Sequence, residues 1–160
     1  MFGLFNSSEP AKLKSIFICE SAGLPMKGVN SVIALKNEGL QDDRYQTKRG
    51  YWDPVEGCQV TVITLYELNR AKKKTSINLD LGQHRRNLVL ASIHPKKLLN
   101  RTLQIGEAVF QYHKPRPPCG YLDQLVMKGT AKALGKNSGF CFKVVKSGII
   151  SVGDEVYIMK

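Results

Sequence analysis

Short segments with strand-like composition recur along this chain, and they restrict its fold more than any other feature. Each segment is rich in β-branched and aromatic residues and is bounded by turn-forming glycine, proline, asparagine, aspartate or serine. The predicted strands lie within residues 14–20, 31–35, 59–64, 83–91, 98–105, 108–112, 140–146, 149–152 and 156–159. Many short strands with few helices predict a mainly β fold, either an antiparallel barrel or a sandwich with helical inserts.

Two short helices are predicted between these strands. Thr64 is the expected N-cap of the first, with Glu67 at the third helical position completing a capping box. Lysines at 72–74 then complement the dipole at the end of this helix. Residues 125–134 carry apolar side chains at both ends and stop at Gly135, which predicts a second, amphipathic helix.

The length of 160 residues suits one domain, and we expect a flexible lead-in over residues 1–12 followed by a single domain over 13–160. No apolar run approaches the roughly 18 residues that a membrane helix needs. The N-terminus lacks the basic and apolar regions of a secretory signal. A cytoplasmic protein without membrane association is therefore expected.

The charge balance predicts an anionic partner. Lysine and arginine number 24 against 13 aspartate and glutamate, a formal charge of +11 that nucleic acid, a membrane surface or a phosphorylated small molecule would satisfy. Nucleic-acid binding is not favoured, because aromatic and basic residues do not interleave at strand spacing. The charged residues Asp42, Asp43 and Arg44 are expected in a solvated loop, where ion pairs contribute little stability.

One cysteine lies in a proline-rich stretch, residues 114–123, which reads KPRPPCGYLD. Proline removes backbone donors and pushes the preceding residue toward extended conformations, so a fixed loop is predicted around Cys119. Lys114 and Arg116 flank the thiol, and nearby cations lower the pKa of a cysteine from about 8.5. The residues alone leave two alternatives open, a reactive thiolate and an inert cysteine in a turn.

The other cysteines, Cys19, Cys58 and Cys141, lie in or next to predicted strands and are expected to be small core residues. Their scattered positions and the absence of C-x-x-C argue against disulfides and against a structural zinc or iron–sulfur site. The usual phosphate-loop, hydrolase-elbow and zinc-protease motifs are also missing from the sequence.

Five stretches follow one another along the chain: GLQDDRY, VTVIT before a helix, HRRNLVL, PRPPCGYLD and GFCFKVVKSGIISVGDEV. In this order the chain resembles a stand-alone MOSC domain, the module named after the C-terminal domain of molybdenum cofactor sulfurase, over about residues 14–160. The resemblance implies a MOSC-type β-barrel of antiparallel and mixed strands with two or three short helices. It also implies a cleft for the molybdenum cofactor (molybdopterin), an anionic pterin that bears a phosphate and a dithiolene.

The resemblance further implies roles for individual residues. In the reductases of the family the cysteine that matches Cys119 is a ligand of molybdenum and the catalytic centre, and thiolate is a soft donor suited to this metal. Arg85 and Asn87 match positions that hold the anionic end of the cofactor. Asp154 matches a carboxylate near the pterin, and Thr64 matches a hydroxyl residue at a helix start. Arg116, beside the cysteine, completes the expected cofactor-binding set, whereas Arg86 is expected to face solvent.

Two functions follow from the resemblance. In the first, the protein binds the molybdenum cofactor through Cys119 and acts in cofactor handling or in reduction of N-hydroxylated compounds. Such an oxidoreductase would need a separate electron-transfer protein, because the extra N-terminal region and the iron–sulfur domain of larger relatives are not found in this sequence. In the second, Cys119 carries a persulfide for metal–sulfur cluster or cofactor assembly, with a cysteine desulfurase as partner. Pyridoxal phosphate, which the sulfurase relatives suggest, is not expected, because no lysine is placed for a Schiff base.

Overall fold

The computed structural model describes residues 9–49, 57–118, 120–136 and 138–159. Residues 1–8 of the predicted lead-in therefore lie outside the described residues. Strand content is 38% against 15% helix, which confirms the mainly β prediction. None of the helices in the described ranges is long and apolar enough to cross a membrane.

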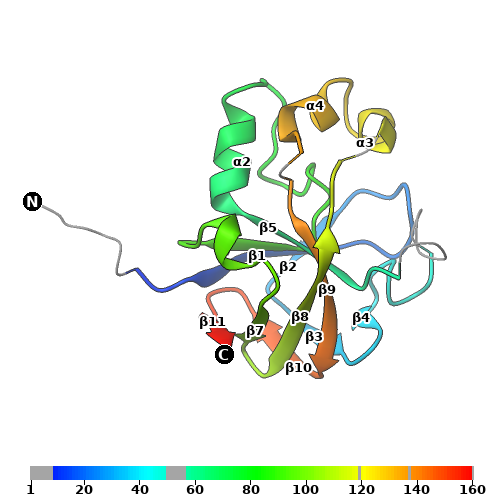
Figure 1. Ribbon diagram of the computed structural model, residues 1–160. Helices are drawn as coiled ribbons and strands as arrows, with labels where there is room; N and C mark the ends of the chain where they lie inside the picture. The colour runs from blue at the N-terminus through cyan, green and yellow to red at the C-terminus, as the bar shows by residue number, and fades with distance from the viewer. Residues whose placement is uncertain (1–8, 50–56, 119, 137, 160) are drawn as a thin grey trace, which may run out of the picture.

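A large mixed sheet organises the fold, with its eight strands in the order β11-β7-β8-β9-β5-β6-β1-β2 (Figure 1). Its strands are β1 (Lys12–Ile18), β2 (Lys27–Val29), β5 (Val60–Thr64), β6 (Leu88–Ala91), β7 (Thr102–Ile105), β8 (Ala108–Pro115), β9 (Phe140–Lys146) and β11 (Val156–Met159). Among the described ladders only β5 and β6 run parallel, since a helix and a long loop carry the chain back between them.

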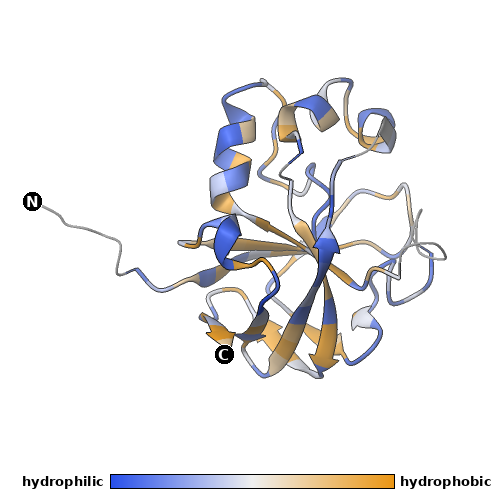
Figure 2. Cartoon of the chain, in the orientation of Figure 1, coloured by the Kyte–Doolittle hydropathy of each residue, from blue (hydrophilic) through white to orange (hydrophobic). Residues whose placement is uncertain are grey.

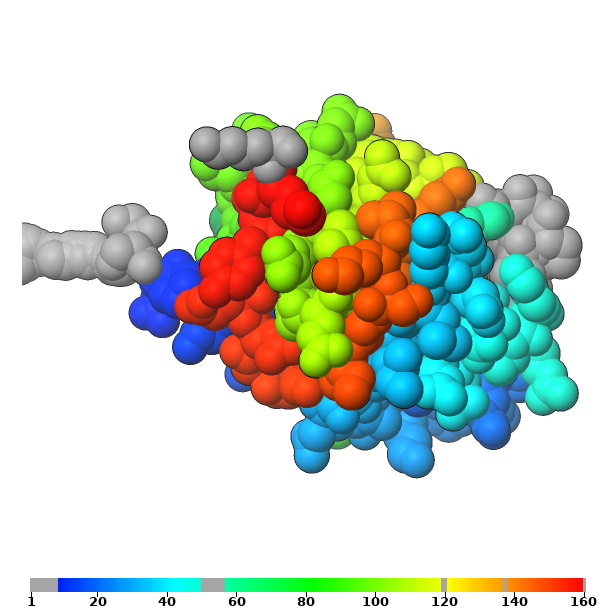
Figure 3. Space-filling model, turned by 90° about the horizontal axis from the view of Figure 1, so that it is seen from below, coloured from blue at the N-terminus to red at the C-terminus, as the bar shows by residue number. Residues whose placement is uncertain are grey.

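A smaller sheet of three strands has the order β10-β3-β4. Its members are β3 (Ser31–Leu35), β4 (Gly39–Leu40) and β10 (Gly148–Ser151). Seen from below in Figure 3, the residues near 35, in cyan, lie beside those near 145, in orange. The backbone bond from Asn37 N to Val144 O, 3.0 Å, joins these two segments.

The predicted barrel is not closed in the described part of the chain, which corrects the barrel expectation. Between β1 and β11 there is a single bridge, from Lys12 to Glu155, in place of a ladder. The reason lies in how β1 uses its two edges. One edge pairs with β6, and the last residues of the other pair with β2, so only residues 11–13 are left for the segment that precedes β11.

Three α-helices lie at one end of the described structure: α2 (Leu65–Lys72), α3 (Gly120–Leu125) and α4 (Thr130–Leu134) (Figure 1). A 3-10 turn, η2, spans Pro95–Lys97. The capping box of α2 is confirmed, because Thr64 Oγ1 accepts from Glu67 N at 3.2 Å and Glu67 Oε1 accepts from Thr64 N at 3.0 Å. The single helix predicted over 125–134 is wrong, because the chain leaves helical geometry after residue 125 and Gly129, with a φ of 99°, precedes α4.

Three hydrophobic clusters lie in the interior of the described structure. The largest contains the inward side chains of the sheets, such as Phe110 and Phe142, and the second, which includes Phe17 and Leu68, lies under α2 and α4. The third consists of Tyr45, Cys58 and Cys141. Figure 2 shows the corresponding pattern, with apolar residues concentrated along the strands and hydrophilic residues on the outer side of α2. The prediction that three cysteines are core residues is confirmed, since all three are buried: Cys19, Cys58 and Cys141.

Candidate functional site

Asp43 is the centre of a buried polar cluster that joins the loop after β4 to β1 and to the start of β6. Its carboxylate is fully buried and accepts from Cys19 N at 3.0 Å, Arg44 Nη1 at 3.1 Å and Asn87 Nδ2 at 3.1 Å. A fourth donor, Tyr45 N, lies 3.3 Å from its second oxygen. The prediction of a solvated loop holds for Asp42, which is exposed, and is wrong for Asp43 and Arg44, because four convergent N–H donors allow the carboxylate to be buried with its charge.

Asn87 connects three strands of the large sheet. Its Oδ1 accepts from the backbone N and the hydroxyl of Thr61 on β5, at 3.0 and 3.1 Å. Its Nδ2 donates to Phe17 O on β1 at 3.0 Å as well as to Asp43. Both donors and both acceptor positions of the amide are thus used within the fold. The cofactor contact expected of Asn87 stays a prediction.

Four arginines are linked to Asp43, Arg44 directly and the others through a series of hydrogen bonds, and we call Arg44, Arg85, Arg86 and Arg116 the arginine cluster. Three of them are only 6%, 8% and 4% exposed, in the order Arg44, Arg85 and Arg86. Arg44 Nη2 donates to Arg85 O at 3.0 Å, and its guanidinium lies 4.6 Å from the ring centre of Tyr45. The Tyr45 hydroxyl in turn accepts from Arg116 Nη2 at 3.1 Å, so one aromatic ring joins two guanidinium groups.

Arg86 is buried rather than exposed to solvent, which corrects the expectation for this residue. Its Nε donates to Ser138 O at 2.8 Å, and its Nη2 donates to Arg116 O at 3.0 Å. Arg85 donates to Leu24 O and, at 3.7 Å, to Cys19 Sγ, and it has a left-handed backbone with a φ of 65°. Since few residues other than glycine adopt such a φ, these contacts hold Arg85 in a specific orientation.

The electrostatics of the arginine cluster are unbalanced. In the described part of the chain, Asp43 is the only carboxylate that pairs with Arg44, Arg85 or Arg86. Burial, and next the guanidinium of Arg116, lower the pKa of Arg86 to about 10. Burial and then Arg44 lower the pKa of Arg85, whereas burial raises the pKa of Tyr45 to about 12 and keeps its phenol neutral. The cluster therefore carries buried positive charge that an anion would stabilise.

The loop before Cys119 is attached to this cluster. Arg116 N donates to Gly139 O at 2.9 Å, and Arg116 O accepts from Arg86 and, at 3.1 Å, from Ser138 Oγ. Cys119 itself, the predicted metal ligand, lies outside the described residues. Among the residues that are described, no group of three His, Cys, Asp or Glu side chains could hold a metal ion.

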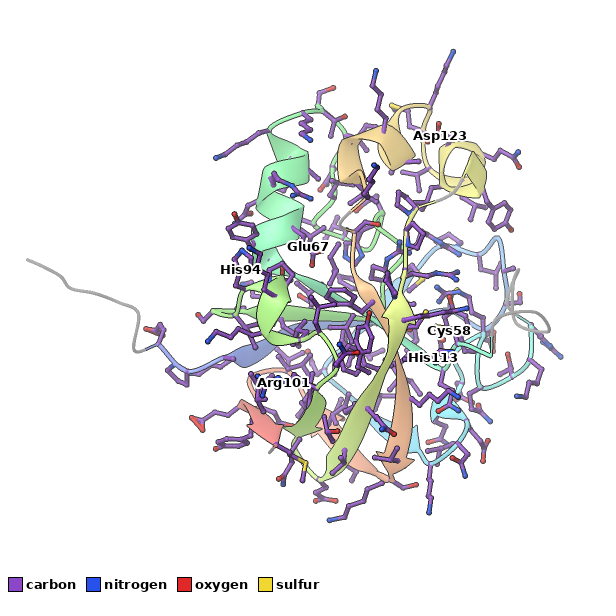
Figure 4. All side chains as sticks on the ribbon, in the orientation of Figure 1. Cys58, Glu67, His94, Arg101, His113 and Asp123 are labelled. Carbon is purple, nitrogen blue, oxygen red and sulfur yellow. The ribbon has the colours of Figure 1, made fainter. Side chains whose placement is uncertain are left out.

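Thr64 is linked to the same region through α2. Its hydroxyl is engaged in the capping box, and the second carboxylate oxygen of Glu67 accepts from Gly139 N at 3.0 Å. Figure 4 shows Glu67 extending from α2 toward the centre of the molecule. Because Gly139 O also accepts from Arg116 N, these bonds connect Thr64 to the arginine cluster without any direct contact between them.

Asp154 lies elsewhere, in the turn between β10 and β11. Its Oδ2 accepts from Ser151 N at 2.8 Å, and its backbone oxygen accepts from Leu13 N at 2.8 Å. Asn87 instead contacts Phe17 O on the same strand, β1. Four residues of strand separate the two contacts, roughly 13 Å. The structure thus brings Arg85, Asn87 and Arg116 together and leaves Asp154 at the other end of β1, where its cofactor role stays a prediction.

The sequence patterns did not identify Asp43, Arg44, Tyr45 and Arg86 as members of the site. Two of the ordered stretches, GLQDDRY and HRRNLVL, contain all four residues. The order of these two stretches along the chain was the one signal that could have pointed to the four residues, because nothing local in either stretch indicates that its charged side chains are buried. Their convergence depends on β1 and β6 being neighbours, which only the sheet order provides.

Comparison with known proteins identifies the family and supports the fold. The MOSC domain model matches residues 54–157, more than half of the chain. YuaD from Bacillus subtilis has a similar fold, with a TM-score of 0.74 and 15% identity over 92% of this chain and 94% of that one. YiiM from Geobacillus stearothermophilus has a TM-score of 0.71 and 17% identity over 94% of this chain and 76% of that one. YiiM from Escherichia coli has a TM-score of 0.62 and 17% identity over 94% of this chain and 69% of that one. Sequence comparison with curated proteins gives no significant match. The chain belongs to the MOSC family.

Proposed function

We propose that this MOSC protein binds the molybdenum cofactor at the arginine cluster, with Cys119 as metal ligand, and acts in cofactor handling or in reduction of N-hydroxylated compounds. The observation that carries the proposal is the excess of buried guanidinium groups over carboxylates around Asp43. Structural arginines are ordinarily paired with carboxylates when buried. A cluster in which Asp43 is the one carboxylate among the described partners of Arg44, Arg85 and Arg86 fits an anionic ligand, and a phosphate accepts the forked donors of arginine.

The chemistry of the donor set supports a phosphorylated pterin. The guanidinium of Arg86 donates to neutral oxygens, Ser138 O and Arg116 O, and that of Arg85 to Leu24 O and a thiol. These acceptors satisfy N–H groups without neutralising the charge. Arg85, Arg86 and Arg116 would hold the anionic end of the cofactor, which when bound supplies a redox-active molybdenum. Arg116 would also position the start of the loop that carries Cys119, since its backbone is bonded on both sides.

The burial of the arginines also favours cofactor binding over the alternatives. A persulfide carrier requires a reactive, accessible thiol, and one nearby cation is enough to lower the pKa of such a thiol, so this role does not call for three buried guanidinium groups. Nucleic-acid binding would use cations on the surface, where they contact the phosphate backbone. Arg44, Arg85 and Arg86 are less than a tenth exposed and are unsuited to that task. An enclosed anion therefore fits the cluster better than a polyanion at the surface.

Metal and pterin contents test the proposal. Protein from a molybdate-supplied host, purified anaerobically, should contain molybdenum by elemental analysis and a fluorescent pterin after oxidation, both near stoichiometric. Cys119→Ala should lose most of the molybdenum and keep more of the pterin, because the phosphate contacts remain. Arg85→Gln and Arg116→Gln should lose both.

Arg101→Gln is the matched control for these variants. Arg101 is exposed, lies just before β7 and is not a member of the arginine cluster; Figure 4 labels its side chain. It should retain wild-type molybdenum and pterin. Equally low contents of both in the wild type and in Cys119→Ala would count against cofactor binding.

A further inference from the structure

A separate cavity of about 280 Å³ lies between β1, the loop that precedes β6, and α2. Its walls include the buried apolar side chains of Phe17, Leu68, Leu79 and Val89. None of the four arginines of the cluster lines it. The cavity is larger than the engineered cavity of about 150 Å³ that holds benzene in another protein, so a substituted ring fits within it.

His84 also lines this cavity and has an unused hydrogen-bonding group. The side chain is fully buried, and its Nδ1 accepts from Arg86 N at 2.9 Å. Burial, and next Arg86, lower the pKa of His84 to about 3, so the ring is neutral and its proton is assigned to Nε2. Within the described structure, Nε2 has no hydrogen-bond partner, and it faces away from the Arg86 amide. Buried donors without an acceptor are few in native proteins and indicate a water or a ligand.

The charged residues that line the cavity favour an anion. Lys14 and Lys72 supply two ammonium groups, whereas Asp80 supplies one carboxylate, which accepts from Lys72 Nζ at 2.8 Å. Lys14 lies on β1 and Lys72 on the last turn of α2, so the cations approach from two elements. Apolar walls, one buried N–H donor and a net positive lining together suit an apolar molecule with one acidic group.

We propose that this cavity binds a small, largely apolar monocarboxylate, with the carboxylate accepting from His84 Nε2–H and attracted by Lys14 and Lys72. The hydrocarbon part would pack on Phe17, Leu68, Leu79 and Val89. This site is distinct from the proposed cofactor site, because none of the described residues that line the cavity is an arginine. The two sites are linked through Arg86, whose backbone amide fixes the His84 ring and whose charge lowers the pKa of His84.

Histidine side-chain NMR tests this proposal, with benzoate as the probe and with benzamide and toluene as neutral comparisons. Benzoate should shift the His84 Nε2 signal saturably. Benzamide should bind several-fold more weakly, and toluene more weakly again. Lys14→Met should weaken the binding of benzoate several-fold and leave the binding of benzamide unchanged. No saturable shift with benzoate would overturn the proposal and leave a cavity that holds only water. Toluene binding as tightly as benzoate would also overturn it, because the cavity would then be a purely apolar site without preference for an acid.

Two substitutions on α2 locate the site. Asn69 is exposed and lines the cavity, so Asn69→Trp should obstruct it and weaken benzoate at least tenfold. Tyr66 is 54% exposed and does not line the cavity, so Tyr66→Trp should bind benzoate as the wild type does. Equal binding by both variants would place the benzoate elsewhere and refute the site. Cys119→Ala should keep full benzoate affinity, which separates this test from that of the cofactor.

Discussion

Replacement of Asp43 by asparagine tests whether its charge stabilises the arginine cluster. Asp43→Asn keeps the shape of the side chain. Its oxygen could still accept at the position of Oδ1, where Cys19 N, Arg44 Nη1 and Asn87 Nδ2 converge. Its NH2 group would face Tyr45 N, a second donor, so that hydrogen bond is lost. Arg44 also loses the carboxylate with which it forms an ion pair. Both side chains of this pair are buried, with exposed fractions of 0% for Asp43 and 7% for Arg44.

The expected loss is large for a substitution of nearly constant volume. Removal of one partner of a buried ion pair costs about 3–5 kcal/mol, against a total of roughly 5–15 kcal/mol for a domain. A loss of about 4 kcal/mol changes the unfolding equilibrium nearly a thousandfold. Urea denaturation should show a lower midpoint with an unchanged m-value.

Asp80→Asn is the matched control, because it breaks an exposed ion pair of the same kind. Lys72 and Asp80 are 39% and 62% exposed, and such pairs contribute about 0–1 kcal/mol. If Asp43→Asn lost no more stability than Asp80→Asn, the carboxylate would not be the charge partner of the cluster.

Two further predictions concern stability. The pKa of His84 is lowered from 6.5 to about 3 in the folded protein, so as the pH falls the unfolded chain binds a proton at His84 before the folded chain does. The contribution of neutral His84 to the free energy of unfolding is therefore fully present above about pH 6.5 and is lost as the pH falls toward 3. At pH 5 the loss is about 2 kcal/mol, and His84→Gln should show a shallower decline between pH 7 and 5 in urea denaturation; identical declines would contradict this. Gly139→Ala should lower the free energy of unfolding by about 1–3 kcal/mol more than Gly153→Ala, because a Cβ at Gly139 would overlap Val62 O whereas one at Gly153 meets open space. Both glycines have a positive φ, 107° and 98°, so backbone strain is similar in the two variants. Equal losses of stability would refute the overlap.

The strands and the first helix could be predicted because their signals are local. Residues 31–35 and 140–146 match β3 and β9 residue for residue, and Thr64 with Glu67 caps α2 as expected. The closed barrel could not be predicted reliably, because closure depends on which edge of β1 is left after β2 and β6 have paired with it. The interrupted helix at 125–134 failed for a different reason: apolar spacing alone does not show that Gly129 is needed for a left-handed turn.

The candidate site was only partly predictable. Arg85, Asn87 and Arg116 were named from their matched positions, and the structure places them in one region. The burial of Asp43, Arg44 and Arg86 was missed, because adjacent charges normally indicate a solvated segment. Burial here requires donors from β1 and the start of β6, which the local sequence around Asp43 does not contain.

The acceptors used by the arginine cluster explain how a fold can maintain an anion site before the anion arrives. Carbonyl oxygens from Leu24, Ser138 and Arg116 satisfy the guanidinium N–H groups and fix their direction, but they leave the positive charge in place. Additional carboxylates would make the fold more stable alone and would compete with a ligand for the same donors. With Asp43 as the one paired carboxylate among the described contacts, the donors stay oriented, and the proposed anion would add the missing charge without reorganisation, which is the condition for tight binding.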